Sequence, residues 1–495
     1  MIRRVDHLLR DPARLVALLV AAQITAWTLA PALTHHALPL DVVESYMWGR
    51  EWVIATYKHP ALPSWVLEAS RRLTGAVGWP AYLVSQLFIG ATFVFVFLLG
   101  RDLMGPRRGA AGTLLLTGIA FYAWPTPEFN HNVAETPFWA ALPWVLWRAV
   151  ERERGGIGWW LLVGAIGAAG LYAKLPTALL LLALALWILW DVRARASLAG
   201  PGPWIGLAVF AALAAPLGLW LVGNDFAPLH YAAERSMGRG GPGVFVFVAS
   251  VALNLVGLFA ILALAGLLGP RRYSASPEPP PPRVAPRALA FLVAVTAGPL
   301  VIAVIAALAS GSILRSAWGS SMFNLAGLLA IALASARFDA TALRRIAVCA
   351  AGLVTLVPLG YALVVIAGPL RDGAPMRVSW PQRDISQRLV EVWTRSTGRP
   401  LRIVSGEPWI AGLVGAGAKD VPSILNVGGP AVSPWITPER VEKEGMLIVW
   451  EARGRRIPQP LQQLVDAAPA KEERFRWPSR KGGDLVIGYV IVPPK

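Results

Sequence analysis

Charged residues and cysteine are what this sequence has least of. Only 15% of its 495 residues are charged, whereas a soluble domain carries about 25%. Its single cysteine, Cys349, excludes a disulfide framework and a cysteine-based metal site. The C-terminal part of the sequence, after residue 370, shows no repeat and no glycine-rich phosphate-binding motif. These absences argue against an ordinary soluble enzyme and direct attention to the apolar residues.

Hydrophobic residues make up 55% of the chain, and the mean hydropathy is +0.53. About 20 apolar residues cross a bilayer once, so most of the chain can consist of membrane spans. The apolar runs predict about eleven transmembrane helices, near residues 14–33, 79–100, 109–124, 134–149, 157–174, 176–191, 203–223, 244–268, 288–309, 321–336 and 345–368. The predicted fold class is therefore an all-α polytopic membrane bundle.

The net charge of +17 comes mainly from arginines in short segments between apolar runs. With the N-terminus inside, every predicted cytoplasmic segment is basic, which the positive-inside rule requires. The sequence thus predicts an N-in, C-out topology, with a basic N-terminus followed by a retained first span. Scattered arginines also argue against nucleic-acid binding, which gathers its charge on one module. The Arg-, Ala-, Gly- and Pro-rich composition suggests a bacterial origin.

The composition changes after residue 370, so we predict two domains, 1–370 in the membrane and 371–495 soluble. The second resembles a small α/β domain on the outer face, large enough for its own core. We expect helices in "PQRDISQRLVEVWTRS" and "PWIAGLVGAG", and strands in "LRIVSG", "MLIVWEAR" and "DLVIGYVIV". The Pro-rich run "RRYSASPEPPPPRVAPR", residues 271–287, is expected to be a cytoplasmic linker.

Unusual polarity is concentrated in four outward loops, residues 34–78, 125–133, 224–243 and 310–320. The first contains "LDVVESYMWGREWVIATYKHPALPSW". Its Asp41 and Glu44 have i, i+3 spacing, which places both on one face of a helix. Asp41 lies near the helix start, where free N–H groups favour an anion. The following "LPSWVLEASRRL" predicts an amphipathic helix suited to the membrane interface.

The other loops add acids, amides and cations. "PTPEFNHNVAETPFW" places two Glu, two Asn and a His at the entrance of a span, where polar groups are costly unless they face a cavity or one another. Lys174 lies between two spans in "YAKLP". Arg235 and Arg239 lie in the third loop, and Arg315 and Trp318 in the fourth.

These residue types support one kind of chemistry. A carboxylate can take a proton from an attacking alcohol, and cations can neutralise a departing phosphate. Aromatic side chains can stack on a sugar. Outside the cytoplasm a transferase has no nucleotide sugars, so its donor must already be attached to a lipid. A lipid phosphate would explain why charge is found at the membrane boundary.

The sequence resembles the integral-membrane glycosyltransferases of the GT-C fold, specifically the bacterial relatives of protein O-mannosyltransferases and of lipid A aminoarabinose transferases. The matching pieces are "LDVVESYMWG", "KHPALPSW", "FNHNVAETPFW" and "YAKLP", in order, over roughly the first 180 residues. The resemblance implies an inverting transfer of a sugar from a polyprenyl phosphate, with Asp41 as the base. It also implies that His59, in "HPAL", with Lys58 before it, contacts the phosphate.

The sequence departs from the family pattern in two respects. The usual adjacent Asp-Glu pair is spread to Asp41 and Glu44, and the acid of the second loop has no clean match. The predicted site is catalytic: Asp41 and Glu44; phosphate-binding: Lys58, His59, Lys174, Arg235, Arg239 and Arg315; sugar- or acceptor-binding: Trp48, Tyr57, Glu128, Asn130, His131, Asn132 and Trp318. No cofactor is expected, and a divalent metal at His131 and Glu128 has weak support from so few ligands.

Simpler roles remain open for these residues. Asp41 could cap its helix, Lys174 could extend to the interface, and the three loop arginines could contact headgroups. A transporter or flippase of lipid-linked sugars, or a non-catalytic partner in envelope-polymer assembly, is the alternative function. The expected partners are membrane lipids, a polyprenyl-phosphate sugar and a glycolipid, polysaccharide or protein acceptor. The expected location is the bacterial inner membrane, with the loops and C-terminal domain in the periplasm.

Overall fold

The computed structural model describes residues 9–151, 156–236, 243–268, 283–368, 376–427, 429–452, 461–462, 469–477 and 484–495. Three features expected from the sequence lie outside these residues. They are Arg239, most of the Pro-rich linker and the predicted domain boundary at 370/371.

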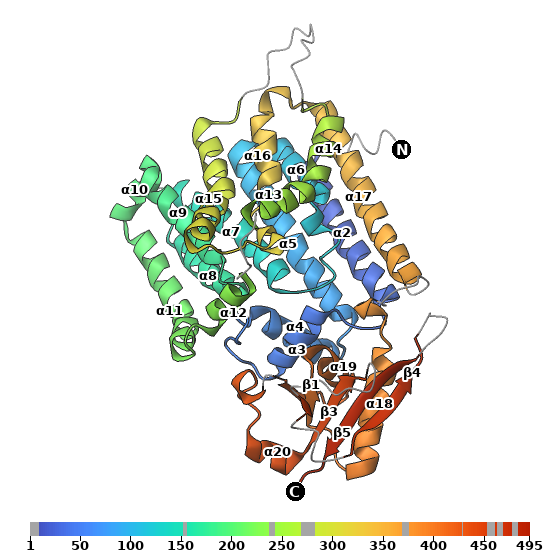
Figure 1. Cartoon of the computed structure of the whole chain (residues 1–495). Coiled ribbons are helices and arrows are strands. Elements are labelled where there is room, and N and C mark those ends of the chain that lie inside the picture. The colour runs from blue at the N-terminus through green and yellow to red at the C-terminus, as the bar shows by residue number, and fades with distance from the viewer. Residues whose placement is uncertain are drawn as a thin grey trace.

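Helices from α2 to α17 form a bundle, with a compact domain at one end (Figure 1). The helices of the bundle are α2 Pro12–Thr34, α3 Leu40–Arg50, α4 Leu62–Thr74, α5 Trp79–Met104, α6 Pro106–Leu114, α7 His131–Glu151, α8 Ile157–Ala173, α9 Thr177–Trp190, α10 Val192–Ala196, α11 Pro201–Gly223, α12 Ala227–Ser236, α13 Gly243–Asn254, α14 Val256–Leu264, α15 Pro286–Ser310, α16 Ala326–Leu333 and α17 Ala340–Ala367. Short 3₁₀ turns join some of them, namely η1 Leu115–Gly118, η2 Ala120–Tyr122, η3 Ser197–Ala199, η4 Ser316–Gly319 and η5 Ser335–Arg337.

Fewer helices are long and apolar enough to cross a membrane than the sequence predicted. Among the described residues five qualify, namely α2, α5, α11, α15 and α17. Two bent pairs raise the number to seven if each is one span. The first pair, α9 and the segment Val192–Ala199, is bent by 87°. The second pair, α13 and α14, is bent by 43°. The expectation of a multi-pass helical membrane protein is therefore confirmed, and its number of spans is five to seven by this measure rather than eleven.

Part of the difference arises where an apolar run does not form one long helix. The run predicted at 109–124 is divided among α6, η1 and η2, and the run at 321–336 contains only the eight residues of α16. α8 has 17 residues, fewer than the roughly 20 that a helix needs to cross a bilayer. Hydropathy reports the apolar character of such runs but not where the backbone turns.

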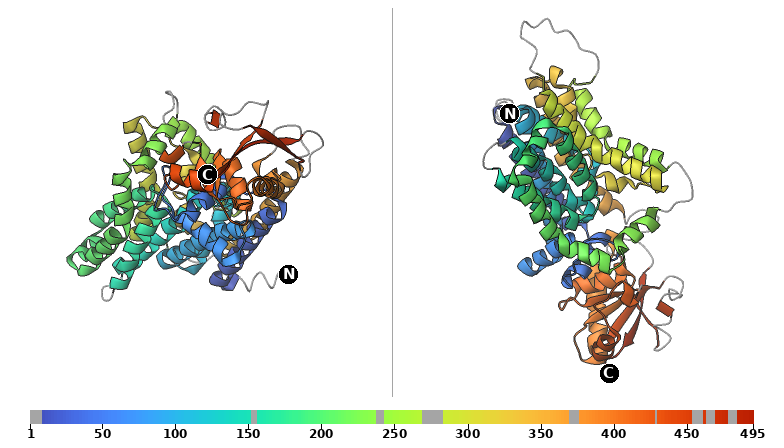
Figure 2. Two further views of the ribbon diagram at one scale, coloured as in Figure 1. Left: turned by 90° about the horizontal axis from the view of Figure 1, so that it is seen from below. Right: turned by 90° about the vertical axis from the view of Figure 1, so that its left-hand side faces the viewer.

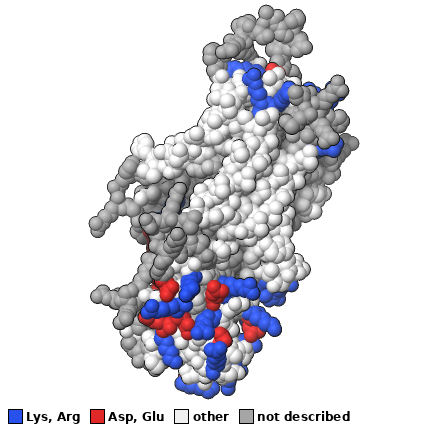
Figure 3. Space-filling view, turned by 90° about the vertical axis from the view of Figure 1, so that its right-hand side faces the viewer, with Lys and Arg blue, Asp and Glu red and all other residues white. Residues whose placement is uncertain are grey.

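The surface of the bundle agrees with a membrane location. The face in Figure 3 has a broad belt without charged side chains, with charged residues at the upper end and on the C-terminal domain. Exposed large apolar side chains occur along α11, α15 and α17, including Leu219, Leu308 and Leu363. Figure 2 shows the C-terminal domain at one end of the bundle, away from the end where α2 begins.

The C-terminal domain is built on a mixed five-stranded sheet in the order β2-β1-β3-β5-β4. Its elements are η7 Arg377–Ser379, α18 Gln382–Thr397, β1 Ile403–Gly406, α19 Pro408–Gly417, β2 Ser423–Asn426, η8 Gly429–Ala431, α20 Pro438–Glu444, β3 Met446–Glu451, β4 Lys471–Phe475 and β5 Leu485–Val492. β1 pairs in parallel with β2 and β3, while β5 is antiparallel to β3 and β4. Every helix and strand expected here is present. The short β2, the charged β4 and α20 were not predicted.

Two glycines allow α8 and α11 to lie against each other. A Cβ on Gly164 would lie 2.2 Å from the carbonyl oxygen of Gly206, and a Cβ on Gly206 would lie 2.6 Å from that of Trp160. Small residues permit this close approach between helices in a membrane, where packing replaces the hydrophobic effect. On the same helix, a Cβ on Gly218 would meet nothing within 4 Å.

We expect Gly206→Val to destabilise the protein and Gly218→Val to leave its stability nearly unchanged. Overpacking a tight contact costs about 1–3 kcal/mol, and both changes place the same residue in the same helix. Thermal unfolding of the purified proteins in detergent measures the difference. Equal melting temperatures for the two variants would contradict the observed packing of α8 on α11.

Candidate functional site

α3 is the helix on which the site is built, and it is buried on nearly all sides. Residues 42–49 are all buried, between α4 on the bundle side and α19 of the C-terminal domain. Pro39 occupies the N-cap position and Asp41 lies in the first turn, as the sequence predicted. The carboxylate of Asp41 accepts a hydrogen bond from another loop, so its position is set by more than its own helix.

Asp41 meets the second outward loop through two hydrogen bonds. The side-chain amide of Asn130 donates to Oδ2 of Asp41 over 2.9 Å, and the backbone N–H of Asp41 donates to Oε1 of Glu128, also over 2.9 Å. Oδ1 of Asn130 in turn accepts from the backbone N–H groups of Asn132 and Val133, which fixes the amide at the start of α7. Two carboxylates 87 residues apart in sequence therefore lie side by side.

The proximity of the two carboxylates has an electrostatic consequence. Burial, and then the negative charge of Asp41, raises the pKa of Glu128 to about 7. Both causes act in the same direction because each disfavours a second negative charge at this place. Glu128 is thus neutral in acid and ionised in base, with the change close to neutral pH.

Glu44, one turn after Asp41, forms an ion pair with Lys58. Nζ of Lys58 lies 2.5 Å from Oε1 of Glu44, and both side chains are largely buried. Burial lowers the pKa of Lys58, but the Glu44 carboxylate outweighs it and raises that pKa above its ordinary value. Lys58 therefore remains a cation at neutral pH.

Three aromatic rings surround the same ammonium group. Nζ of Lys58 lies 5.6 Å from the centre of the Tyr57 ring, 5.7 Å from Tyr231 and 5.8 Å from Trp48. We call these three rings the aromatic enclosure. The negative faces of such rings attract a cation within about 6 Å. The sequence nominated Trp48 and Tyr57 but missed Tyr231, although an aromatic residue four positions before Arg235 in an outward loop was a usable signal.

His59 and His131 stack on each other beside the enclosure. Their ring centres are 4.1 Å apart, and Nε2 of His131 is 2.9 Å from the carbonyl oxygen of Pro60. Burial, followed by the neighbouring His131 and the cations around it, lowers the pKa of His59 well below its ordinary value. The His59 ring is therefore neutral at pH 7 and can offer an N–H donor rather than a charge.

Lys174 lies deeper than the other cations. Its Nζ donates to Oδ1 of Asn132 over 2.7 Å and lies 3.1 Å from Oε1 of Glu135. Lys174 is 4% exposed and Glu135 is fully buried. The hydroxyl of Ser321 also donates to Oε1 of Glu135, whereas Oε2 has no hydrogen-bond partner among the described residues. These contacts give Lys174 a structural partner, and its predicted contact with a phosphate stays a prediction.

The third and fourth loops reach the same end of the bundle. The guanidinium of Arg235 lies 5.6 Å from the centre of the Tyr231 ring, and its carbonyl oxygen accepts from Nη2 of Arg315 over 2.8 Å. Arg235 and Arg315 are exposed, and Trp318 is half-buried in η4. The structure therefore brings together residues from all four outward loops that the sequence singled out. The predicted roles of Arg235, Arg315 and Trp318 stay predictions.

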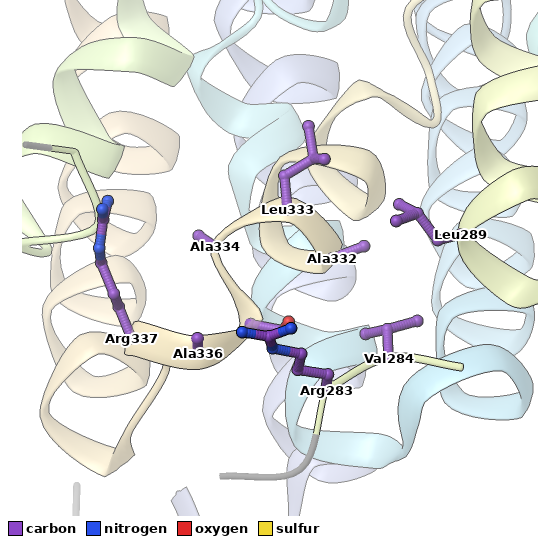
Figure 4. A pocket seen from close by; sticks show the side chains of 9 residues that line it. Arg283, Val284, Leu289, Ala332, Leu333, Ala334, Ala336 and Arg337 are labelled. Carbon is purple, nitrogen blue, oxygen red and sulfur yellow. The ribbon is translucent and has the colours of Figure 1, made fainter. Parts of the chain in front are cut away.

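Two further features of the molecule concern metal binding and a cavity away from this cluster. No group of three or more His, Cys, Asp or Glu among the described residues could hold a metal ion. A cavity of about 350 Å³ lies at the other end of the bundle, beside the last turn of α16 (Figures 1 and 4). Its lining includes the charged side chains Arg283 and Arg337 and no acid.

With this geometry established, known families provide a comparison. Residues 58–220 match the sequence profile of the dolichyl-phosphate-mannose-protein mannosyltransferase family. The GT-C resemblance seen in the sequence is thereby confirmed. No curated protein matches the chain by sequence.

Solved structures show the fold of this chain over nearly its whole length. The crystal structure of ArnT from Cupriavidus metallidurans bound to undecaprenyl phosphate aligns with a TM-score of 0.62 at 14% identity, over 96% of this chain and 97% of that one. The apo form of the same protein aligns with a TM-score of 0.61 at 13% identity, over the same shares of the two chains. An oligosaccharyltransferase from Archaeoglobus fulgidus aligns with a TM-score of 0.43 at 12% identity, over 89% of this chain and 69% of that one, too weakly to carry an argument.

The family segment covers only part of the cluster. It includes Lys58, His59 and the whole second loop, but it begins after Asp41 and Glu44. Asp41 itself lies outside the matched segment. Its hydrogen bonds with Asn130 and Glu128 are what place it next to that segment. Glu128 was nominated as a sugar or acceptor contact, and sequence spacing gave no sign that it would lie next to Asp41.

We expect Lys174→Met to destabilise the protein, because it leaves Glu135 buried without its counterion. Removing one partner of a buried ion pair costs about 3–5 kcal/mol. The double variant Lys174→Met/Glu135→Leu should recover most of the loss. Thermal unfolding in detergent measures both effects.

A surface pair serves as the control for this experiment. Lys495→Met removes the partner of Glu442, where both side chains are exposed, and should change stability by less than about 1 kcal/mol. Wild-type stability of Lys174→Met would show that the Lys174–Glu135 pair does not form.

Proposed function

We propose that this protein is an inverting glycosyltransferase that moves a sugar from a polyprenyl-phosphate donor to an acceptor hydroxyl. The observation that carries the proposal is Asp41, held by Asn130 beside Glu128, at the end of an apolar bundle and on the same helix as the partner of Lys58. The match of residues 58–220 to the dolichyl-phosphate-mannose-protein mannosyltransferase family supports it. The shared fold with an ArnT structure that contains undecaprenyl phosphate supports the class of lipid.

In the proposed reaction Asp41 acts as the general base. Its carboxylate takes the proton of the acceptor hydroxyl while the oxygen attacks the anomeric carbon of the sugar. The bond from that carbon to the phosphate oxygen breaks, and its electron pair leaves with the polyprenyl phosphate. A single displacement of this kind inverts the anomeric centre. Asn130 keeps the carboxylate oriented, and Glu128 adds negative charge near the sugar as positive charge develops there.

The departing phosphate is assigned to Lys58, with Arg235 at the exposed side of the enclosure. Lys58 stays charged because of Glu44, and a cation at a leaving phosphate lowers the barrier by stabilising its growing charge. His59 contributes a neutral N–H donor in this arrangement. The apolar surface of the bundle offers the polyprenyl tail a route in the bilayer.

The proposed location is the bacterial inner membrane, with the site and the C-terminal domain in the periplasm. The support is the basic character of the predicted cytoplasmic segments and the gathering of the outward loops with the C-terminal domain at one end (Figure 1). The acceptor is a hydroxyl on a glycolipid, polysaccharide or protein.

We expect Asp41→Asn to lower the rate of sugar transfer by about 10²–10⁴-fold, the range typical for loss of a general base. The measurement is product formation from a radiolabelled polyprenyl-phosphate sugar by purified protein in detergent. A transporter gives no product without compartments, so this assay also separates the two classes of function.

The matched control is Asp225→Asn. Asp225 is exposed in an outward loop, and its φ of 48° is one that asparagine tolerates. This variant should retain the wild-type rate. Normal turnover by Asp41→Asn would remove Asp41 from the role of base.

We expect the transfer rate of the wild-type protein to rise as the pH increases through about 7. Because the pKa of Glu128 is raised to about 7, its carboxyl is protonated below that pH and carries a charge above it. The ionised form strengthens Asp41 as a base and stabilises positive charge on the sugar. Glu128→Gln should be slower and should lose this rise. A pH profile with the same inflection in Glu128→Gln would assign it to another group.

A further inference from the structure

The surface that joins the C-terminal domain to the bundle lies directly beside the aromatic enclosure. We propose that this domain is part of the donor site, and that Asn426 is a positioning residue that orients Tyr57 and through it the enclosure of Lys58. The inference rests on the proposed function, because it concerns the lipid phosphate assigned to Lys58.

Tyr57 is the member of the enclosure with the least support from its own segment. Trp48 lies in α3 and Tyr231 in α12, whereas Tyr57 belongs to the irregular segment 51–61 between two helices. Next to Tyr57, the described backbone contacts are a bridge between Ala55 and Pro60 and a hydrogen bond from the N–H of Thr56 to the carbonyl oxygen of His59. A ring on such a segment needs an outside contact to hold its direction.

Asn426 supplies that contact from the C-terminal domain. Its side-chain amide donates to the hydroxyl of Tyr57 over 3.3 Å. Asn426 is the last residue of β2, lies in register with Gly406 of β1, and is 8% exposed. Its backbone N–H donates to Oγ of Ser433. The amide that reaches Tyr57 is therefore carried by a rigid sheet.

Neighbouring residues of the same domain hold the start of the segment. Oγ of Ser423 donates to Oε1 of Glu51 over 2.6 Å and accepts from Nη2 of Arg440 over 2.9 Å. Nη1 of Arg50 donates to the carbonyl oxygen of Asp420 over 3.2 Å. Residues 420–426 thus form hydrogen bonds with the segment from Arg50 to Tyr57, immediately before Lys58.

A fourth contact fixes α3 itself against the domain. α19 packs on α3 so closely that a Cβ on Gly412 would lie 2.1 Å from Cγ1 of Val43. Val43 is fully buried between Asp41 and Glu44. The domain is therefore in contact with both sides of the predicted site, the helix that carries the acids and the segment that carries Tyr57 and Lys58.

The test is a double-mutant cycle on lipid binding. Asn426→Ala removes the donor, and Tyr57→Phe removes the hydroxyl while keeping the ring near Lys58. The probe is undecaprenyl phosphate in detergent, with its Kd taken from the fluorescence of the tryptophans, which include Trp48 in the enclosure. A hydrogen bond of ordinary net strength predicts about a three- to tenfold weaker Kd for each single variant.

Coupling between the two positions is the decisive quantity. If Asn426 acts through the Tyr57 hydroxyl, the double variant binds no more weakly than either single variant. If the fold-change in Kd of the double variant equals the product of the two single fold-changes, the inference is overturned, because the two residues then act independently. Unchanged binding by both single variants would also overturn it. Tyr57→Phe lies outside the C-terminal domain, so it tests the contact even if Asn426→Ala disturbs that domain.

The control is Arg395→Ala, on an exposed part of α18 where Arg395 pairs only with Glu391 among the ion pairs of the described residues. It should bind the lipid with the wild-type Kd. If the wild-type protein binds undecaprenyl phosphate but transfers no sugar, the proposed function is wrong, while the inference about Asn426 and Tyr57 is still supported by the binding data. Wild-type protein that does not bind the lipid would overturn both.

Discussion

The hydrogen bonds between the first turn of α3 and the loop before α7 are the interaction on which the rest of the site depends. They bring Asp41, Asn130 and Glu128 to one place, although these residues lie on separate loops. At the end of an apolar bundle, such polar groups are stable only when they satisfy one another. The same requirement that makes them costly therefore also holds them in a defined geometry.

Positive charge is arranged at three depths around these acids. Arg235 is exposed, Lys58 is largely buried against Glu44, and Lys174 is buried against Glu135. Each step inward replaces solvent with a carboxylate partner. Arg235 is open to solvent, while Lys174, at the end of α8, joins that helix to Glu135 of α7. His59 lies among these cations and is neutral because of them and its burial.

Much of the helical character and the polar loops of the site could be predicted from the sequence, because hydropathy and charge report on each segment by itself. The run at 109–124 shows the limit of such predictions: it is largely apolar, yet its α-helix ends at Leu114 and two 3₁₀ turns follow. Asp41 was identified from its place at a helix start. The neighbourhood of Glu128 was not, since 87 residues separate the two and only the packing of α3 against the second loop joins them.

The sequence by itself determined that this chain lies in a membrane, that acids and cations gather in a few loops between apolar segments, and that a small α/β domain follows the bundle. These properties depend on local composition and periodicity, which can be determined without knowing any tertiary contact. Tertiary structure alone decided that Glu128 lies beside Asp41, that Lys174 is paired inside the bundle, and that Asn426 of the last domain reaches Tyr57. Those pairings depend on how helices from distant parts of the chain pack, and no local pattern encodes that.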